Sequence, residues 1–494
     1  MKWFYNITAC FLCAFLFFNV SPVWSQETNS YVSGRVLSDK KETFVAATVT
    51  VIHEPTQNRY ISLTRNDGYF HFFNLKPGGP YSIIISYVGY KTLKEINLYI
   101  NLNSDHFAAP GKTGSCDFIL EKKSDTLEGI IINSNNLNKT KNGAETNISY
   151  STLQSLPSVS RSFQDFIRLV PQAKVTGDGV MSLAGQNNRF NAFFIDGANN
   201  NDILGLSANG TNGGQTGSPP VSIEAIEEIK VLLAPYDVQY GNFTGGSINA
   251  ITRSGSNETK ASAWYYFRNE NLAGRSPVPI ERQGSPGEFY RPRLSHFVNQ
   301  TAGAWLSGPL VKNKVFYFAL LEKQSDVKPQ PFDYNEYLGT SNQQQINALA
   351  DSLRSKYKYE PGSFLETKDE LDATRLVLKF DWNASVKNKF MLSYRYNDAE
   401  RSAPRVQSSA TSVIFQNNGF ILPAKTHTAS LEWKHFFKKD MNNRLLFTYT
   451  NELDDRKWIG QPFPRVTIFD GIGSVVFGSD ANSAVNIFKA TDIT

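Results

Sequence analysis

The sequence predicts a mainly β protein: an N-terminal β-sandwich, then an α+β domain, then the first part of a transmembrane antiparallel β-barrel. Three observations predict it. Aromatic residues make up 13% of the chain, helical periodicity is scarce, and the second half contains alternating strands joined by connections of alternating length. Abundant aromatic residues suit the interfacial girdles of a membrane barrel. The net charge of +5 over 494 residues is mild and forms no basic stripe, so nucleic acid is not an expected partner.

Residues 1–25 have the pattern of a secretory signal peptide. Ile7–Val20 is its apolar core, and Val23–Ser25 is the cleavage end. The rest of the chain has no apolar run long enough for a transmembrane helix, so any membrane-spanning part must be a β-barrel. Cys10 and Cys13 leave with the signal peptide. Cys116 then remains alone, and no intrachain disulfide is expected.

Residues 31–121 predict a small β-sandwich. Its strongest strand signal is a run of alternate apolar residues at positions 45, 47, 49 and 51. Asn66-Asp67-Gly68 predicts a hairpin turn between the strands Tyr60–Thr64 and Tyr69–Phe73.

Residues 122–149 are polar and predict a flexible linker with one apolar, β-prone run. The run is Leu127, Glu128, Gly129, Ile130, Ile131, Ile132 and Asn133. It is either the last strand of the sandwich or a strand that a partner protein pairs with by β-augmentation.

Residues 150–258 predict the α+β domain. Arg161–Leu169 has apolar residues at helical spacing, and Phe190–Ile195 is an apolar strand. The Gly- and Asn-rich stretch Ala198–Ser218 is long for a loop without structure, so a functional role is expected. A second helical run is predicted over Ser222–Glu228.

The end of this domain predicts two strands. The strand Ile229–Ala234 stops at Pro235, and a glycine-rich turn, Gly241–Gly246, leads into the strand Ser247–Thr252. This stretch joins small soluble units to the long amphipathic strands that follow.

From residue 259 the chain predicts barrel strands. About seven are expected, at Lys260–Arg268, Ser295–Leu306, Lys314–Glu322, Thr374–Trp382, Phe390–Asn397, Thr426–Phe436 and Leu445–Thr450. Long connections (Asn269–Leu294, Lys323–Ala373 and Asp398–Lys425) alternate with short ones (Ser307–Asn313, Asn383–Asn388 and Phe437–Asn443). Outer-membrane barrels have short periplasmic turns and long extracellular loops, whereas a soluble sandwich has no reason to segregate them.

Two regions resemble known families. Gly34-Arg35-Val36, Asp67–Phe70, Leu75–Gly78 and Tyr87–Tyr90 resemble a carboxypeptidase-regulatory-like domain, which is a non-catalytic sandwich. Phe193–Gly197, Ile223–Thr252 and Ser307–Phe318 resemble the plug strand, plug ending and early barrel of TonB-dependent outer-membrane receptors, of the Bacteroidetes or Oar-like type.

The receptor resemblance implies a function. An extracellular ligand (siderophore, vitamin, glycan or peptide) binds, and the inner-membrane TonB–ExbB–ExbD complex pulls an N-terminal segment to rearrange the plug. The run Leu127–Asn133 is the candidate TonB box. Ligand contacts are expected from the apical loops of the plug and from the long barrel loops, with Arg189, Asp196, Asn199, Asn200, Asn201 and Asp202 as candidates. Turn formation is the competing explanation for the Asp and Asn residues. Membrane lipid is the other expected partner, and no cofactor or metal is implied.

The sequence departs from the receptor pattern in two ways. The family's Arg-Gly-Pro is Leu233-Ala234-Pro235 here, so the arginine is absent. Seven strands are below the minimum of about eight for a closed barrel, and Ala490–Thr494 lacks a terminal aromatic residue. We therefore expect a fragment or truncated product of a longer receptor.

The sequence bears on two other functional classes. An enzyme is not expected, because no H-E-x-x-H, G-x-S-x-G or complete P-loop pattern is present, and His106 stands where a P-loop needs its first glycine. A surface adhesin or structural outer-membrane protein remains the alternative, although a plug would be superfluous for adhesion. The sequence does not identify the ligand or a lipoprotein partner.

Overall fold

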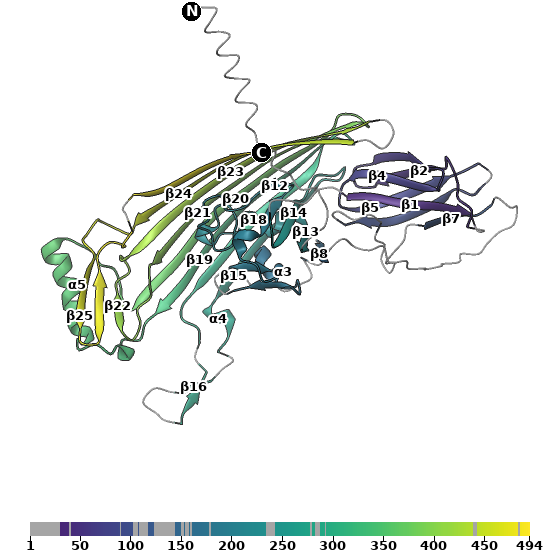
Figure 1. Cartoon of the computed structure of the whole chain (residues 1–494). Coiled ribbons are helices and arrows are strands. Elements are labelled where there is room, and N and C mark those ends of the chain that lie inside the picture. The colour runs from purple at the N-terminus through teal and green to yellow at the C-terminus, as the bar shows by residue number, and fades with distance from the viewer. Residues whose placement is uncertain are drawn as a thin grey trace, which may run out of the picture.

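The structure is a computed structural model of the chain. It describes residues 30–38, 41–88, 90–101, 107, 117–122, 144–149, 153, 158, 161–176, 179–233, 243–276, 279–281, 287–291, 293–437, 442–482 and 485–494. A long curved sheet, called the wall below, holds a smaller domain against its concave face (Figure 1). The N-terminal sandwich lies at one end of the wall, and helix α5 lies at the other. The predicted signal peptide lies outside the described residues.

The sandwich consists of two sheets around one apolar core. One sheet has the order β4-β1-β7 and the other β3-β2-β5-β6. The strands are β1 (Ser30–Ser38), β2 (Thr48–His53), β3 (Asn58–Leu63), β4 (Tyr69–Leu75), β5 (Gly78–Ser86), β6 (Leu93–Ile100) and β7 (Asp117–Leu120). The predicted alternation is confirmed in β2, where Val49 and Val51 are fully buried.

The predicted hairpin at Asn66-Asp67-Gly68 is wrong. The turn itself forms, because Gly68 adopts a positive φ of 76° and its amide donates to the Arg65 carbonyl over 2.9 Å. However, β3 pairs with β2, and β4 pairs with β1 in the other sheet. The turn therefore carries the chain from one sheet to the other, a distinction that local turn residues do not encode.

The domain inside the wall, called the inner domain (described residues within 144–258), contains a five-stranded sheet of order β12-β11-β14-β13-β8. Its strands are β8 (Ala144–Ser149), β11 (Ala192–Ile195), β12 (Ala198–Asn199), β13 (Ile226–Leu233) and β14 (Gly246–Thr252), with β9 (Ala173–Val175) and β10 (Met181–Leu183) as a separate pair. β8 pairs along its length with β13. The linker predicted over residues 122–149 is therefore wrong for its last six residues.

Helices in the inner domain are short. α3 covers Phe163–Ile167, inside the predicted Arg161–Leu169, and its apolar face is buried as expected. The 3-10 turns are η1 (Asn188–Phe190), η2 (Gly214–Thr216) and η3 (Ile223–Ala225). The helical run predicted over Ser222–Glu228 is wrong beyond η3, because β13 already begins at Ile226 and pairs there with β14. Burial within the sheet overrides the local helical preference.

The wall is an antiparallel sheet of eight strands in the order β15-β18-β19-β20-β21-β23-β24-β27. They are β15 (Lys260–Asn269), β18 (Val298–Val311), β19 (Val315–Pro331), β20 (Glu366–Asn383), β21 (Asn388–Pro404), β23 (Gly419–Phe436), β24 (Asn442–Trp458) and β27 (Asn486–Ile493). The count of seven missed β27, whose outward residues are not consistently apolar. Short turns join the strands at the end near the sandwich, the turn end, and longer segments join them at the loop end.

The predicted alternation of barrel strands is confirmed. In β20, Arg375 and Lys379 are buried on the concave face, whereas Phe380 and Trp382 are 40% and 50% exposed on the convex face. Near the turn end, Trp382, Phe390 and Trp433 stack along the convex face with ring centroids 5.2 and 6.2 Å apart. An aromatic row at a strand end is the girdle expected at a membrane surface.

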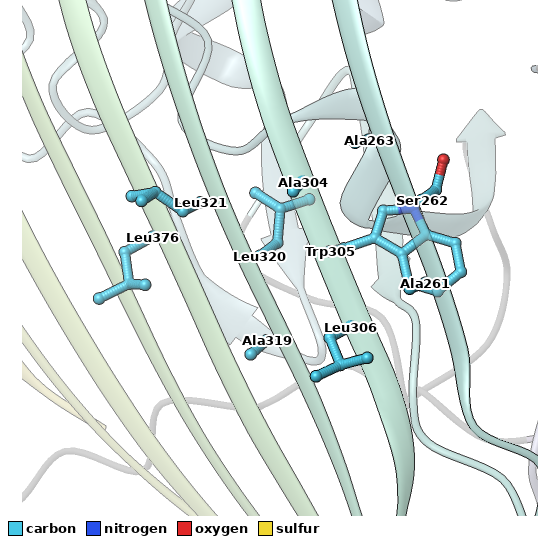
Figure 2. A pocket seen from close by; sticks show the side chains of 10 residues that line it. All are labelled: Ala261, Ser262, Ala263, Ala304, Trp305, Leu306, Ala319, Leu320, Leu321 and Leu376. Carbon is cyan, nitrogen blue, oxygen red and sulfur yellow. The ribbon is translucent and has the colours of Figure 1, made fainter.

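The convex face also has an apolar depression across β15 to β20, with a volume of about 500 Å³. Figure 2 shows its lining of alanine, leucine, serine and tryptophan side chains. Leu306 and Leu321 point away from the inner domain, whereas Trp305 and Leu320 pack against it. The lining carries no charged residue, as expected for a surface facing lipid tails.

Two predicted long loops are shorter than expected. β19 runs to Pro331 and β20 starts at Glu366, inside the loop predicted over Lys323–Ala373, and β21 and β23 shorten the one over Asp398–Lys425 in the same way. The strands continue beyond the apolar outward residues, because ladder hydrogen bonds do not require an apolar face.

Three loop-end segments fold together into one unit, called the loop lobe (residues 332–365, 405–418 and 459–482). It contains η4 (Tyr334–Glu336), α5 (Gln343–Tyr357), β22 (Ser412–Ile414), β25 (Val466–Asp470) and β26 (Gly473–Phe477). Its core includes residues from all three segments: Ile346, Leu353, Phe364, Val413, Phe415, Val475 and Phe477. The segment before β18 forms α4 (Glu270–Ala273) and the small pair β16 (Ile280–Glu281) and β17 (Phe289–Tyr290).

None of the helices in the described ranges is both long enough and apolar enough to cross a membrane.

Candidate functional site

The interface between the inner domain and the wall is the candidate functional site. The inner domain fills the space beside the concave face, so any path along that face is open only if the contacts between them change. One set of contacts is apolar: Trp305, Phe318, Leu320 and Val377 of the wall belong to the same buried cluster as the inner-domain core. Charged and polar groups make the others.

The first charged contact centres on Asp196. This residue follows β11, adopts a positive φ of 52° and is 3% exposed. Its carboxylate accepts hydrogen bonds from the Thr252 amide (3.0 Å) and hydroxyl (2.5 Å). Lys379 Nζ of β20 lies 3.0 Å from Asp196 Oδ1 and also donates to the Thr252 carbonyl over 3.1 Å. Asp196 therefore joins two strands of the inner domain to the wall.

The second charged contact centres on Arg375, which is 2% exposed. Its guanidinium donates to Glu322 (2.6 Å), to the Ser218 hydroxyl (2.9 Å) and to the Pro219 carbonyl (3.0 Å). The Ser222 hydroxyl in turn donates to Glu322 over 2.7 Å. Because each buried charge is paired and hydrogen-bonded, this contact can persist in a low-dielectric interior.

A third contact lies beside β15. Arg161 pairs with Glu224 within the inner domain and stacks over the Tyr266 ring of the wall at 4.5 Å. The Tyr266 hydroxyl donates to Glu224 over 3.1 Å. Arg253, at the end of the inner domain, lies 4.2 Å from the Trp305 ring.

The segment Ala198–Ser218 makes a fourth contact, with β24. It is not a loop without structure: β12, η2 and a bridge between Asn201 and Thr211 organise it. The Gly213 amide donates to Glu452 of β24. Asp202 faces both Glu452 and Asp454, so carboxylates meet across this part of the interface.

The predicted ligand residues have different surroundings. Arg189 is exposed and donates to the Gly205 carbonyl over 2.8 Å. The Asn201 side chain accepts from the Phe193 amide, Asn199 accepts from the Asn201 amide, and Asp202 caps Leu204 and Gly205. Asn200 is 3% exposed. The Asn199, Asn201 and Asp202 side chains thus make hydrogen bonds within the inner domain, and Asp196 contacts the wall. A role in ligand binding stays a prediction for these residues.

Some predicted sites cannot be placed. The candidate TonB box Leu127–Asn133, Pro235 and the Tyr240-Gly241 pair lie outside the described residues. The sequence reading also missed Lys379, Arg375, Glu322 and Glu452. Their signal was present as charged residues at the inward positions of alternating strands, but the alternation does not show which of them meet the inner domain. Among the described residues, no group of three or more His, Cys, Asp or Glu side chains is arranged to hold a metal ion.

Comparison with known families matches three successive parts of the chain. Residues 31–109 match the carboxypeptidase regulatory-like domain, residues 138–248 the TonB-dependent receptor plug domain, and residues 251–345 an outer membrane beta barrel domain. The resemblance drawn from the sequence and the predicted fold class are both confirmed.

Individual proteins match parts of the chain. The TonB-dependent transporter Oar of Myxococcus xanthus is 34% identical over 162 residues, which are 32% of this chain and 14% of Oar. The protein named "Probable TonB-dependent siderophore receptor PirA" of Acinetobacter baumannii is 24% identical over 265 residues, 51% of this chain and 32% of that protein. The outer membrane transporter YddB from Escherichia coli is 14% identical with a TM-score of 0.48, covering 70% of this chain and 44% of YddB. The chain thus spans less than half the length of these relatives.

Proposed function

We propose that the protein is a TonB-dependent outer-membrane receptor that binds an extracellular ligand and imports it with energy from the TonB–ExbB–ExbD complex. The order of the three matched domains supports this function. The matched relatives are named as receptors and transporters rather than enzymes. The alternative of a surface adhesin has no support among them.

One observation carries the proposal: the inner domain lies against the concave face of the wall, held by an apolar contact on β18 to β20 and, beside it, by polar contacts with Lys379, Arg375 and Glu322. Lys379–Asp196 is a buried ion pair across the interface. The Arg375–Glu322 pair lies within the wall and makes hydrogen bonds to Ser218, Pro219 and Ser222 of the inner domain. These polar contacts can be exchanged for water when the domain moves. A structural or adhesive barrel gains nothing from such a removable obstruction. A transporter needs it, because the barrel must be closed at rest and open during import.

The candidate TonB box, Leu127–Asn133, has a useful position in the chain. It precedes β8, which is an edge strand of the inner sheet and pairs only with β13 among the described strands. A pull on the box would act on the β8–β13 ladder through the N-terminal end of β8. Force on this segment would therefore reach the inner domain before the wall.

The ligand contacts are proposed at the loop end. Arg189 and the segment Asn199–Asp202 belong to the inner domain, and the loop lobe is the folded unit at the loop end of the wall. Asp196 is not retained as a ligand contact, because its carboxylate binds Lys379 and Thr252. Ferric siderophores are the first ligands to test, since one relative is named as a siderophore receptor.

The test is energy-dependent uptake in cells that carry the full-length gene. We expect a labelled ferric siderophore to bind the surface and enter, with entry stopped by a protonophore. Deletion of residues 127–133 should abolish entry and leave binding intact, whereas deletion of the neighbouring seven residues, 134–140, should have a smaller effect. Undiminished import after deletion of residues 127–133 would contradict the TonB-box assignment. Binding that never leads to entry would favour the adhesin.

Export through a signal peptide at residues 1–25 is part of the proposal. We expect the mature protein, isolated from outer membranes, to begin close after Ser25. N-terminal sequencing of that protein tests the site, and an N-terminus at Met1 would contradict it.

A further inference from the structure

The sandwich is docked at the turn end of the wall and touches the inner domain as well. Lys389 of β21 donates to the Tyr60 hydroxyl over 2.6 Å, and its ammonium lies 4.0 Å from the Tyr60 ring centroid. The Asn257 amide, at the end of the inner domain, donates to the Pro55 carbonyl over 2.8 Å. Lys76 of the sandwich lies 3.8 Å from Asp381 of β20. Three parts of the chain therefore meet at one place.

A polar cavity of about 90 Å³ occupies this junction. Its lining combines sandwich residues Tyr60 and Lys76, inner-domain Asp196, and Lys379 and Asp381 of the wall. Lys379 and Asp381 are two positions apart in β20, so both project toward the concave face. Charges of alternating sign thus lie in order from the inner domain to the sandwich: Asp196, Lys379, Asp381 and Lys76. Lys389, Lys434 and Glu432 of the wall also line the cavity.

The order of this row has a physical consequence. With the sandwich docked, Asp381 has Lys76 as a neighbour, and Lys379 binds Asp196. If Lys76 leaves, Asp381 keeps interactions with Lys379, Lys434 and Lys389, so Lys379 is shared more evenly between the carboxylates of Asp381 and Asp196. Sharing one ammonium between two carboxylates weakens its bond to each. Release of the sandwich would therefore loosen the contact between Asp196 and the wall.

We propose that the sandwich acts as a latch that holds the inner domain against the wall. Lys76 of the sandwich neutralises Asp381, so that Lys379 remains paired with Asp196 of the inner domain. The latch is a property of the folded chain. Its use in controlling import rests on the function proposed above. The sandwich would then have to leave the turn end, or shift on it, before the inner domain can move freely.

Hydrogen exchange in the full-length protein tests the latch without any ligand. The Thr252 amide is the reporter, because it donates to Asp196. We expect Lys76→Gln to speed exchange of the peptide containing Thr252 about fivefold, the scale of a partly buried ion pair. Peptides from the sandwich core strands β2 and β5 should keep wild-type exchange, which shows that the sandwich itself stays folded.

Two further variants distinguish two ways in which the sandwich could slow exchange at Thr252: by neutralising Asp381, or only by shielding this region from solvent. Lys91→Gln removes a sandwich lysine whose partner, Glu121, lies 3.4 Å away on an exposed surface, and it should leave Thr252 unchanged. The double variant Lys76→Gln with Asp381→Asn removes the competing carboxylate, so slow exchange at Thr252 should return although Lys76 is absent. A sandwich that protects only by covering would leave the double variant as fast as the single one.

The outcomes are distinct from those of the uptake test. Unchanged exchange in Lys76→Gln, or fast exchange in the double variant, overturns the latch and leaves the proposed transport function standing. Faster exchange with restoration supports the latch even if no ferric siderophore enters the cell. Faster energy-dependent uptake in Lys76→Gln would show that the latch also controls import.

Discussion

The inner domain meets the wall in two unlike ways. On β18 to β20 it buries Trp305, Phe318, Leu320 and Val377 in its own apolar core. Toward β21, β23 and β24 the concave face is polar, with buried Asn397, Thr428, Thr450 and Glu452 in place of apolar side chains. The charged pairs of Lys379 and Arg375 lie between these regions, on β20.

This difference indicates how the inner domain can move. Apolar contacts have no substitute in water, so separating them exposes surface at a cost of about 25 cal/mol per Å². Polar groups exchange their partners for water at a much smaller net cost. The β18–β20 side should therefore stay attached while the β21–β24 side opens, and the predictions below test that asymmetry.

Removing the apolar anchor should have the largest effect. Trp305 is 7% exposed and stacks with Arg253, so Trp305→Ala should destabilise the protein by about 4 kcal/mol. Denaturant unfolding of the full-length protein in detergent measures this value. The neighbouring Leu306 points away from the inner domain and is 44% exposed, so Leu306→Ala should cost about 1 kcal/mol. Equal losses would show that the apolar side is not an anchor.

Breaking the pair of Lys379 and Asp196 should have the second-largest effect on stability. Lys379→Met leaves the Asp196 carboxylate buried beside Thr252 without its cation, which should cost about 3 kcal/mol. Adding Asp196→Asn removes the stranded charge, so the double variant should be more stable than Lys379→Met alone. The same unfolding experiment measures both. A double variant less stable than the single one would mean that the residues do not act as a pair.

A small change on the polar side should be milder. Gly213 has a φ of 67°, and a Cβ there would lie 2.7 Å from Thr426 Oγ1 of the wall. Gly213→Ala should cost about 2 kcal/mol, from backbone strain plus the clash. Gly205 has nearly the same φ, 68°, with nothing within 4 Å, so Gly205→Ala should show the strain alone, about 1 kcal/mol. Equal losses of stability in the two variants would show that the interface at Thr426 has room for the added methyl group.

The smallest expected effect is at the sandwich. Burial, Lys76 and Lys389 hold the pKa of His53 well below its usual value. Its ring is packed against Tyr81 and bonded to Thr56, the other groups facing it. His53 stays neutral in the folded sandwich at a pH where it is protonated in the unfolded chain. It therefore does not change the free energy of unfolding above pH 6.5, and it lowers that free energy progressively as the pH falls below 6.5.

From pH 6.5 to 5.5 we expect a loss of roughly 1 kcal/mol from this histidine. His53→Gln should remove that part of the pH slope in thermal unfolding. His296→Gln, at a side chain that is 74% exposed near the loop end, should leave it in place. An unchanged slope in His53→Gln would contradict the assignment.

Much of the fold followed from sequence pattern because the pattern is local. Period-two alternation located the wall strands and their inward charges, and glycine turns located the end of the inner domain. What the sequence did not reveal depends on distant partners. The sheet order shows that the turn at Gly68 changes sheets and that Ala144–Ser149 joins the inner sheet, and the side-chain contacts show that Asp196 meets Lys379. The alternation shows on which face of the wall a charged side chain lies, but it does not show which residue the side chain pairs with.

The loop lobe restricts how new recognition can arise in this protein. Its core takes residues from three separate segments, and Asp470 of the third segment accepts hydrogen bonds from Tyr337, Thr340 and Ser341 of the first. Replacing any one segment alone would leave the other two with unmatched surfaces. Diversification should therefore proceed by exchange of all three as a block, or by changes confined to their outer surface. A designer who transplants a specificity from another receptor faces the same constraint and must carry three pieces of sequence together.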